Sequence, residues 1–418
     1  IFGGLKAVVW TDVIQVIILV IGGLLASFMV VSALGDGSYF AGLSTLLEKA
    51  PEKFNMILSP GEDGYSQLPG ISVLIGGMWV ANLYYWGNNQ YIIQRALAAK
   101  SIGEAQKGVA FAALLKLMMP LIVVVPGIAA FIILQDPAAY GFTGAGISKP
   151  DEAFPWVLNN YVTVGFKGLV TAALVAAIGS SISSMSNSAS TIFTLDIYKS
   201  LIGKNTSDKN LVRIGKITAA ATLLIGGLIA PMLGSLGQVF QYIQEYTGFV
   251  SPGVVAVFIF GLFWRRATAN SALAAIIVCF VALLGIKFLY PSLPFLDRMG
   301  FGFLLASSVI VLVSMLENKA TITDKPKDFV FRIGLIISIL GIAVPSGIKF
   351  VTDGSELLWG ILILVMSAGL IYALLTEKRT NNAKSVPIET SWFKTEAIFN
   401  GLSVIICLIL VVIYSVFW

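Results

Sequence analysis

Long apolar stretches separated by short polar segments run along almost the whole chain. An α-helix that crosses the hydrocarbon core of a bilayer needs about 20 consecutive apolar residues. The pattern predicts such spans at 7–34, 70–98, 108–135, 167–196, 211–233, 237–263, 268–290, 299–317, 330–348, 357–376 and 397–418. Several of them are longer than an upright helix needs, so tilted or broken helices are expected. The sequence therefore predicts an all-α, polytopic membrane protein whose single transmembrane domain covers residues 1–418.

One of these spans, 70–98, is interrupted near its middle. Its first part is apolar (GISVLIGGMWVA, 70–81), and polar and aromatic residues follow at 82–90 (NLYYWGNNQ). The apolar part rises about 18 Å as a helix, which places the polar cluster near the bilayer midplane. Lipid does not tolerate unpaired amide and backbone groups at that depth, so the segment either lines a cavity or packs against protein as a re-entrant corner. In transporters such a cavity is the binding site.

Composition supports the membrane assignment and excludes several kinds of chemistry. The mean hydropathy is +0.88 and only 12% of residues are charged, against about 25% in soluble domains. The absence of histidine excludes histidine acid–base catalysis and histidine metal ligands. Carboxylates are scattered and no pore-loop motif repeats, which disfavours an integral membrane enzyme and a channel, and nothing indicates nucleic-acid binding. Cys279 and Cys407 lie in apolar spans and are expected to be small buried hydrophobic residues.

The basic residues predict the orientation in the membrane. Most of the 27 lysines and arginines lie in alternate connections, with the densest group at 199–216. The positive-inside rule makes these connections cytoplasmic. The first span then runs outward, the interrupted span runs inward, and the loops 35–69 and 136–166 are external. A multi-pass protein of the cell membrane, inner or plasma, is expected.

Charged and amide-bearing residues inside the predicted spans are candidates for function, because a charge costs several kcal/mol at the bilayer centre. Lys116 either pairs with a carboxylate or carbonyl, or donates to a hydroxyl-bearing or anionic ligand. The amides and aromatic rings of 82–90 supply hydrogen-bond donors and acceptors beside ring faces, which suits a neutral sugar better than a lipid or a bare ion. The segment 241–248 (QYIQEYTG) is either a packed hydrogen-bond network or part of a site.

A serine-rich run at 179–188 (GSSISSMSNS) has two interpretations. Small residues spaced by three and four allow close helix packing, which explains most serine-rich membrane helices. Serine hydroxyls and a backbone carbonyl also supply the oxygen ligands that a sodium ion prefers. Ala177, Ser180 and Ser181 fall on one helical face for such a site. Asp12, near the start of the first span, is either an interfacial anion or part of a cation exit path.

Several motifs resemble those of one known family. They are GGLKAVVWTDVIQ at 3–15, WVANLYYWG at 79–87, QYIIQR at 90–95, TIFTLDIY at 191–198, APMLG at 230–234 and QYIQEYTG at 241–248. In this order and spacing they resemble the solute:sodium symporter family, and within it the sodium/glucose (galactose) cotransporter type. The resemblance is specific from residue 1 to about 318 and weak over 319–418.

The resemblance implies a LeuT-like fold of two inverted five-helix repeats. Residues 7–34 then correspond to the last helix of repeat one, 70–263 to repeat two and 268–418 to peripheral C-terminal helices. Ile1 is not expected to be a translation start, and the N-terminal part of repeat one is expected to be missing from this chain.

The resemblance also implies which residues contact the solute. The sugar ligands fall on Asn82, Lys116 and Gln244. Tyr85 resembles an aromatic gate that stacks on the sugar from the cytoplasmic side, and Trp86 lies beside it.

For sodium, the resemblance implies ligands at Ala177, through its carbonyl, and at Ser180 and Ser181. Asp12 resembles the acidic residue on the sodium exit route, and Arg95 is expected to pair nearby. The implied function is sodium-coupled import of a neutral hexose, of the galactose or glucose type, by alternating access. The sodium ion is the co-substrate, sugar and lipid bilayer are the partners, and no enzyme activity is implied. A symporter of another solute, such as inositol, another sugar or an organic acid, is the alternative.

Overall fold

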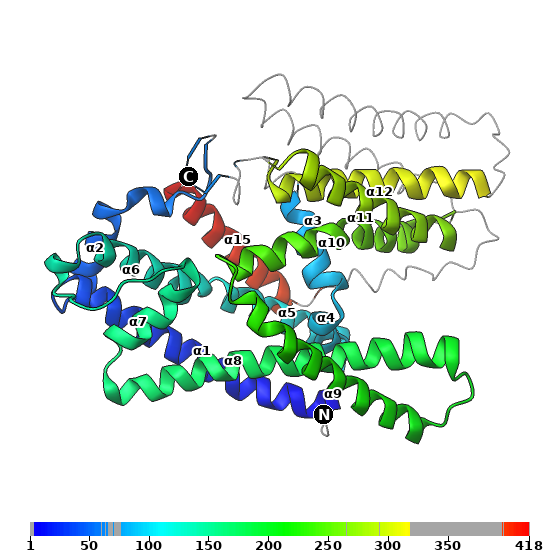
Figure 1. Cartoon of the computed structure of the whole chain (residues 1–418), viewed down its shortest axis with the longest axis horizontal. Helices are drawn as coiled ribbons and strands as arrows, with labels where there is room; N and C mark the ends of the chain where they lie inside the picture. Colours follow the sequence, from blue (N-terminus) through cyan, green and yellow to red (C-terminus); the bar gives the residue numbers. More distant parts are fainter. Residues whose placement is uncertain are drawn as a thin grey trace. The chain divides into compact units, whose positions relative to one another are not determined.

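The computed structural model describes residues 4–59, 61–62, 64–65, 70, 77–264, 266–291, 293–317, 395 and 397–417 (Figure 1). Every regular element in these residues is helical. Two compact units share the chain: unit 1 takes Ile1–Met56, Gln90–Val239 and Phe393–Trp418, and unit 2 takes Ile57–Asn89 and Phe240–Trp392. The predicted spans 330–348 and 357–376 lie outside the described residues.

Unit 1 contains most of the helices. Its α-helices are α1 (Gly4–Leu34), α2 (Tyr39–Lys49), α4 (Gln90–Leu97), α5 (Ile102–Lys116), α6 (Val125–Gln135), α7 (Ala153–Tyr161), α8 (Val164–Thr191), α9 (Asp208–Leu233) and α15 (Ala397–Val416). The 3₁₀ turns η1 (Pro51–Phe54), η5 (Pro137–Tyr140) and η6 (Pro150–Glu152) lie in connections, and the π-helical segments η4 (Pro120–Val124) and η7 (Ile192–Ile202) continue longer helices. Unit 2 contains α3 (Met78–Leu83), the π-helical turn η3 (Tyr84–Asn88), α10 (Val239–Phe263), α11 (Ala269–Leu289) and α12 (Phe295–Glu317).

Eight helices in the described part of the chain are long and apolar enough to cross a membrane. They are Val9–Leu34, Ile102–Gln135, Val164–Ile202, Asp208–Leu233, Val239–Phe263, Ala269–Leu289, Phe295–Ser314 and Ala397–Val416. Each coincides with a predicted span, with ends that shift by a few residues. The all-α membrane architecture is therefore confirmed.

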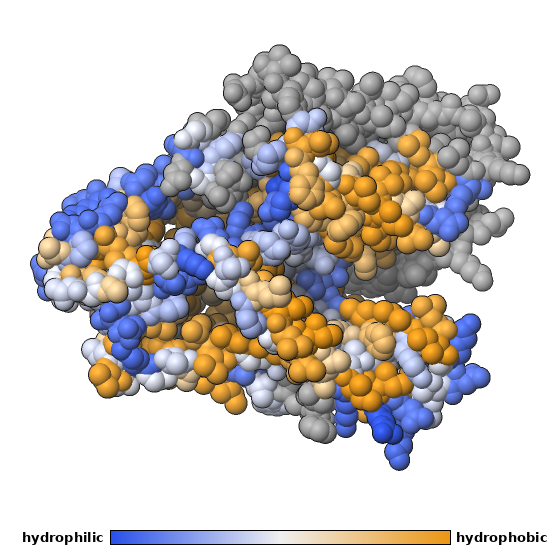
Figure 2. Space-filling model, in the orientation of Figure 1, coloured by the Kyte–Doolittle hydropathy of each residue, from blue (hydrophilic) through white to orange (hydrophobic). Residues whose placement is uncertain are grey.

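The surface of these helices is apolar. On α9, Leu224, Leu228 and Met232 recur every fourth residue and are about 70% exposed. Such a continuous apolar stripe is typical of a surface that faces lipid or another protein. In Figure 2, hydrophobic residues extend along α8 and α9, and hydrophilic residues gather around α2 and around the connection between η7 and α9. This distribution fits a unit whose middle lies in hydrocarbon and whose ends are in water.

The span predicted at 70–98 is interrupted where the sequence indicates. Helix α3 passes into the π-helical turn η3, Asn89 adopts an extended backbone (φ −84°, ψ 114°), and α4 begins at Gln90. A π-turn widens the helix and leaves its regular bonding ladder, as is frequent at functional sites. The break at the polar cluster is therefore confirmed.

Helices α1 and α8 run side by side in unit 1 and pack very closely (Figure 1). A Cβ atom placed on Gly22 would lie 2.9 Å from the Cβ of Ala173 and 3.4 Å from the Cα of Val170. Small residues at such crossings let two membrane helices approach to backbone contact, where van der Waals packing stabilises the pair. This contact brings the polar residues near the start of α1 against the serine-rich part of α8.

A predicted external loop is attached to the turn between α9 and α10. The ammonium group of Lys149 donates to the carbonyl of Gly234, just beyond the end of α9. The carboxylate of Asp151 accepts a hydrogen bond of 2.8 Å from the amide of Val239, the first residue of α10. The two side chains therefore satisfy an otherwise unpaired carbonyl at one helix end and an unpaired amide at the next helix start.

The same loop is closed upon itself by Glu152. Its carboxylate accepts hydrogen bonds from the backbone amide of Ser148 at 2.8 Å and from the hydroxyl of Ser148 at 3.0 Å. Chiefly because of the backbone amide, the pKa of Glu152 lies below its ordinary value.

Unit 2 has a core formed by α10, α11, α12 and α3. Phe260, Leu283 and Phe303 are fully buried in it, and the rings of Trp79 and Phe303 meet edge to face at 4.8 Å. A Cβ on Gly77 would lie 1.7 Å from the carbonyl oxygen of Leu296, so only glycine fits at this approach to α12.

The two cysteines are free, as predicted, but only one is buried. Cys279 lies in the core of unit 2, where its thiol donates to the carbonyl of Gly302 at 3.4 Å. Cys407 is exposed on α15, so the prediction that it is buried is wrong. Helix α15 contains no buried residue, because the apolar side chains of a helix that faces lipid do not need to be covered by other helices.

Candidate functional site

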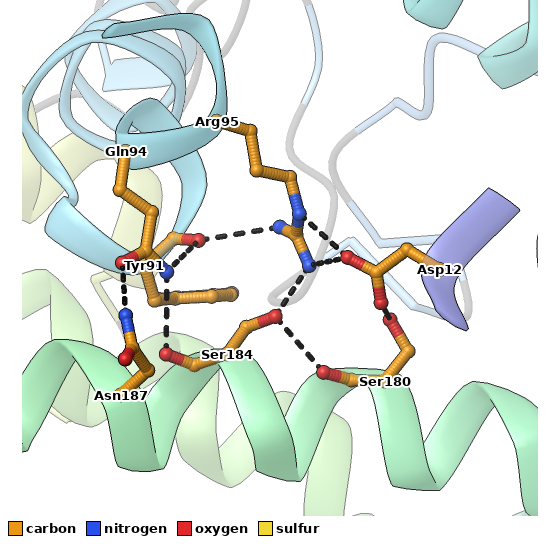
Figure 3. A network of polar contacts seen from close by, with 7 residues as sticks. All are labelled: Asp12, Tyr91, Gln94, Arg95, Ser180, Ser184 and Asn187. Carbon is orange, nitrogen blue, oxygen red and sulfur yellow. Dashed lines mark hydrogen bonds and ion pairs between the residues drawn. The ribbon is translucent and has the colours of Figure 1, made fainter. Parts of the chain in front are cut away.

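A network of polar side chains joins α1, α4 and α8 inside unit 1 (Figure 3). Its central contact is an ion pair between Asp12 and Arg95, in which Nη2 lies 2.6 Å and Nε lies 2.8 Å from Oδ2. The other carboxylate oxygen, Oδ1, accepts a hydrogen bond from the hydroxyl of Ser180. Only 13% of the Asp12 side chain is exposed. The carboxylate is therefore neutralised by one guanidinium and fixed by one serine, and the expected pairing with Arg95 is confirmed.

Arg95 also connects α4 to α8. Its Nη1 donates to the carbonyl of Tyr91 at 3.2 Å, and its Nη2 donates to the hydroxyl of Ser184. The same Ser184 hydroxyl donates to the carbonyl of Ser180 at 2.9 Å. One guanidinium thus holds a carboxylate on α1 and a hydroxyl on α8, as the planar fork of arginine allows.

A second contact between the same two helices lies beside it. The amide nitrogen of Gln94 donates to the carbonyls of Tyr91 at 3.1 Å and Ser184 at 3.3 Å. Its amide oxygen accepts a hydrogen bond of 3.0 Å from Asn187. Gln94 is 6% exposed, and these bonds use both ends of its amide. Such a satisfied network rigidifies the helix crossing.

The residues predicted to bind sodium follow one another on α8. Ser180 is half-buried and bonded to Asp12, Ala177 is half-buried, and Ser181 is exposed. Within the described ranges, no group of three or more histidine, cysteine, aspartate or glutamate side chains is arranged to hold a metal ion. A cation at this point of α8 would draw on hydroxyl and carbonyl oxygens, which is the donor set that sodium accepts. The ligand assignment itself stays a prediction.

Three of the predicted solute residues lie on the interrupted span of unit 2. Asn82 is exposed, and its amide nitrogen donates to the carbonyl of Met78 at 2.9 Å. The ring of Tyr85 meets that of Trp86 edge to face, with centroids 5.2 Å apart and planes at 81°. Trp86 is 42% exposed. The last turn of α3 thus presents one amide, and the π-turn that follows presents two ring systems.

The other two predicted solute residues lie on separate helices. Gln244 is exposed on α10 in unit 2, and Lys116 is the exposed last residue of α5 in unit 1. A lysine at a helix C-terminus is stabilised by the carbonyl dipoles there. Their grouping with Asn82 around one solute stays a prediction.

A charged cluster in unit 2 was not predicted from the sequence. The two carboxylate oxygens of Glu245 on α10 bind different cations: Arg298 Nη2 on α12 at 2.6 Å and Lys287 Nζ on α11 at 3.2 Å. The signal that could have found it is one acid and two bases inside or directly beside three consecutive apolar spans, since a charge in lipid needs a partner.

Comparison with known proteins places the chain in a family. The model of the sodium:solute symporter family matches residues 1–279. The chain belongs to the sodium:solute symporter family. The match covers the interrupted span, the serine-rich helix and all of α10, so the family resemblance expected from the motifs is confirmed.

The proteins that the chain resembles include a sodium/glucose cotransporter and sodium/myo-inositol cotransporters. The chain is 50% identical over 364 residues to the sodium/glucose cotransporter of Vibrio parahaemolyticus. This alignment covers 85% of the present chain and 64% of the Vibrio protein. It is 32% identical over 301 residues to the human sodium/myo-inositol cotransporter, covering 65% of this chain and 41% of that protein. The chain thus spans less than two thirds of the length of these relatives.

One solved structure has a similar fold. It is the substrate-bound, outward-open state of a Na+-coupled sialic acid symporter, described as revealing a novel Na+ site. The TM-score is 0.59 with 26% identity, over 75% of this chain and 63% of that one. The expected LeuT-like, all-α membrane fold is therefore confirmed, and the chain is a multi-pass membrane protein.

Proposed function

We propose that the protein to which this chain belongs is a symporter that imports a neutral hexose together with sodium by alternating access. The observation that carries the proposal is the interrupted span. An amide and two aromatic rings are presented at Asn82, Tyr85 and Trp86, in a chain half identical to a sodium/glucose cotransporter. A sugar offers hydroxyls for an amide and an apolar face for a ring, so both the amide of Asn82 and the rings of the π-turn have a use.

Asn82 is proposed as a ligand that accepts as well as donates. One N–H of its amide is used by the carbonyl of Met78. The carbonyl oxygen of the amide and its second N–H remain for a solute hydroxyl. Gln244 and Lys116 would supply further donors, and Tyr85 with Trp86 would close the cytoplasmic side by stacking on the sugar.

Sodium is proposed to bind α8 at the carbonyl of Ala177 and the hydroxyls of Ser180 and Ser181. Because the Ser180 hydroxyl donates to Asp12, its proton points to the carboxylate and its lone pairs are left for a cation. Asp12 would then orient a sodium ligand and lie on the exit route. Arg95 would compensate the negative charge of Asp12, so that the carboxylate does not itself bind the sodium ion too tightly for release.

The proposed organisation follows the family fold. Residues 7–34 would be the last helix of repeat one, 70–263 repeat two, and 268–418 peripheral helices, all within one transmembrane domain. The mechanism needs no covalent chemistry, because the sodium gradient supplies the driving force. The proposed function is therefore that of a carrier and not of an enzyme.

A symporter of a cyclic polyol is the second candidate. Sodium/myo-inositol cotransporters are 32% identical to the chain over 301 residues, which is 65% of this chain. A polyol ring offers hydroxyls as a hexose does, so the amide of Asn82 and the aromatic rings of Tyr85 and Trp86 do not distinguish a polyol from a hexose.

Uptake into proteoliposomes tests the proposal. The full-length protein is reconstituted, and labelled galactose, glucose and myo-inositol are offered with an inward sodium gradient or with potassium in its place. We expect sodium-dependent hexose uptake that Asn82→Ala or Gln244→Ala weakens by at least about tenfold in sugar affinity. Uptake of hexose indifferent to sodium would refute the coupling. Uptake of inositol alone would replace hexose by the second candidate.

A further inference from the structure

Glu245 occupies the packed face of α10, although it is a carboxylate in a predicted membrane span. The buried residues of α10 recur on one stripe that includes Gly248, Phe249, Pro252 and Ala256. These positions lie three, four, seven and eleven residues after Glu245, which is the spacing of one helical face. Glu245 therefore extends the buried stripe toward the start of the helix and faces α11 and α12.

Glu245 is also the neighbour of Gln244, the predicted solute ligand. Adjacent residues on an α-helix point about 100° apart. When Glu245 faces α11 and α12, Gln244 points about 100° to one side of that contact, and Gln244 is exposed. The direction of the Gln244 amide is thus set by the rotation of α10 about its own axis.

The contacts of Glu245 fix that rotation. Oε1 binds Arg298 Nη2 at 2.6 Å and Oε2 binds Lys287 Nζ at 3.2 Å, so the carboxylate is held from two neighbouring helices. Lys287 Nζ also lies 4.6 Å from the ring centroid of Tyr246 and 5.7 Å from that of Phe249, both on α10. Any rotation of α10 would move the carboxylate away from at least one cation.

Because the charged groups of this cluster are largely shielded from water, their relative positions are tightly constrained. Arg298 is only 6% exposed, and 21% of the Glu245 side chain is exposed. A buried charge that loses its partner is strongly unfavourable, whereas the intact cluster is nearly neutral for stability compared with apolar packing. Such a cluster therefore specifies geometry more than it adds stability, as buried polar groups do when they fix a helix register.

We propose that Glu245, held by Lys287 and Arg298, is the positioning residue that sets the rotation of α10 and so aims Gln244 at the solute. The proposal rests on the proposed function only in taking Gln244 as a sugar ligand. It assigns to the cluster the sugar affinity and not the sodium affinity, because the contacts of Glu245 join α10, α11 and α12, whereas the predicted sodium ligands belong to α8.

Transport kinetics of the full-length protein in proteoliposomes test the role. Glu245→Gln keeps the shape and removes the charge, and we expect the KM for sugar to rise about tenfold because a ligating group is misdirected. The maximal rate and the sodium concentration for half-activation should change by less than about twofold. Lys287→Arg, which conserves the charge, should keep the normal sugar KM. Glu104→Gln is the matched control, since Glu104 pairs with Lys107 at 3.1 Å on the exposed face of α5. An unchanged sugar KM in Glu245→Gln, or an equal loss of sugar and sodium affinity, would overturn the proposal.

A labelling experiment tests the rotation without any solute. Gln244→Cys is introduced after the exposed Cys407 and any other reactive cysteine have been replaced, and its rate of reaction with a small aqueous maleimide is measured. Glu245→Gln should slow that reaction several-fold, and Glu104→Gln should not. An unchanged rate would overturn the positioning role. If the unaltered protein imports no sugar with sodium, the proposed function fails, while the labelling rates still decide the role of Glu245.

Discussion

Replacing Asp12 by Asn separates the charge of this carboxylate from its shape. In the native structure Asp12 accepts hydrogen bonds from Arg95 Nε at 2.8 Å and from Ser180, with Arg95 Nη2 2.6 Å away. An asparagine keeps an acceptor for the Ser180 hydroxyl. It removes the charge opposite the guanidinium, so α1 loses its strongest polar bond to α4.

The expected loss of stability follows from the exposure of the two partners. Removing one member of a fully buried pair costs about 3–5 kcal/mol. The Arg95 side chain is 32% exposed, so its guanidinium regains part of its hydration, and its bonds to Tyr91 and Ser184 stay in place. We therefore expect Asp12→Asn to lower the free energy of unfolding by about 2 kcal/mol.

A double-mutant cycle with Arg95→Gln measures the pair itself. The full-length protein is unfolded in detergent micelles, and the four variants of the cycle are compared. The coupling free energy should be about 1.5 kcal/mol, because either single change already removes the ion pair. The same cycle on the exposed pair of Glu104 and Lys107 should give about 0.5 kcal/mol or less. If the effects at Asp12 and Arg95 add within about 0.5 kcal/mol, the ion pair does not hold α1 to α4 and the reasoning is refuted.

Three further predictions concern other parts of unit 1. Gly22→Val places a branched side chain where even a Cβ would lie 2.9 Å from the Cβ of Ala173 on α8, so it should lower the free energy of unfolding by about 1–3 kcal/mol. Gly226→Ala is the control, because a Cβ there meets no atom within 4 Å and should not lower stability. Equal effects of the two substitutions would contradict the close packing of α1 and α8. Asp151→Ala removes the acceptor for the first amide of α10 and should cost about 1 kcal/mol in the same assay, with unchanged stability counting against the cap. Glu152 has a lowered pKa, so its bond to the Ser148 amide stabilises the loop above the ordinary carboxyl pKa and is lost as the pH falls through the lowered value. The protection factor of the Ser148 amide, which is the exchange rate corrected for its intrinsic pH dependence, should therefore fall on acidification in the native protein and stay constant in Glu152→Gln.

The spans were predictable because hydropathy alone determines which segments enter lipid. The interruption at 82–90 was predictable for the same reason, since amides at the midplane need a special backbone, and the structure has a π-turn and an extended Asn89 there. The start of the span predicted at 108–135 was placed too late. Ser101 caps α5 by accepting from the amide of Glu104 at 3.2 Å, and a polar first turn is invisible to a hydropathy scan.

Side-chain partners far apart in the sequence were mostly beyond prediction. The pairing of Asp12 with Arg95 was expected from the family resemblance. The bonds of Arg95 to Ser184 and of Glu245 to Arg298 were not, because they depend on which faces of separate helices meet. A periodic pattern tells which face of a helix is apolar, but it does not tell which neighbour that face contacts.

The two charged clusters of the described chain share one arrangement, and it suits reversible binding. In unit 1 the Asp12 carboxylate bonds to the hydroxyl of Ser180, and in unit 2 Glu245 is adjacent to Gln244. Each charge is neutralised by a basic partner, and a neutral group beside it is the predicted ligand. In the proposed mechanism, a carrier must release what it binds, so a bare carboxylate in contact with sodium or sugar would hold it too strongly in a medium of low dielectric. Carboxylates placed beside the predicted ligands fix their geometry without binding the ion or the solute directly, and at these two places the predicted ligating atoms belong to an uncharged hydroxyl and an uncharged amide.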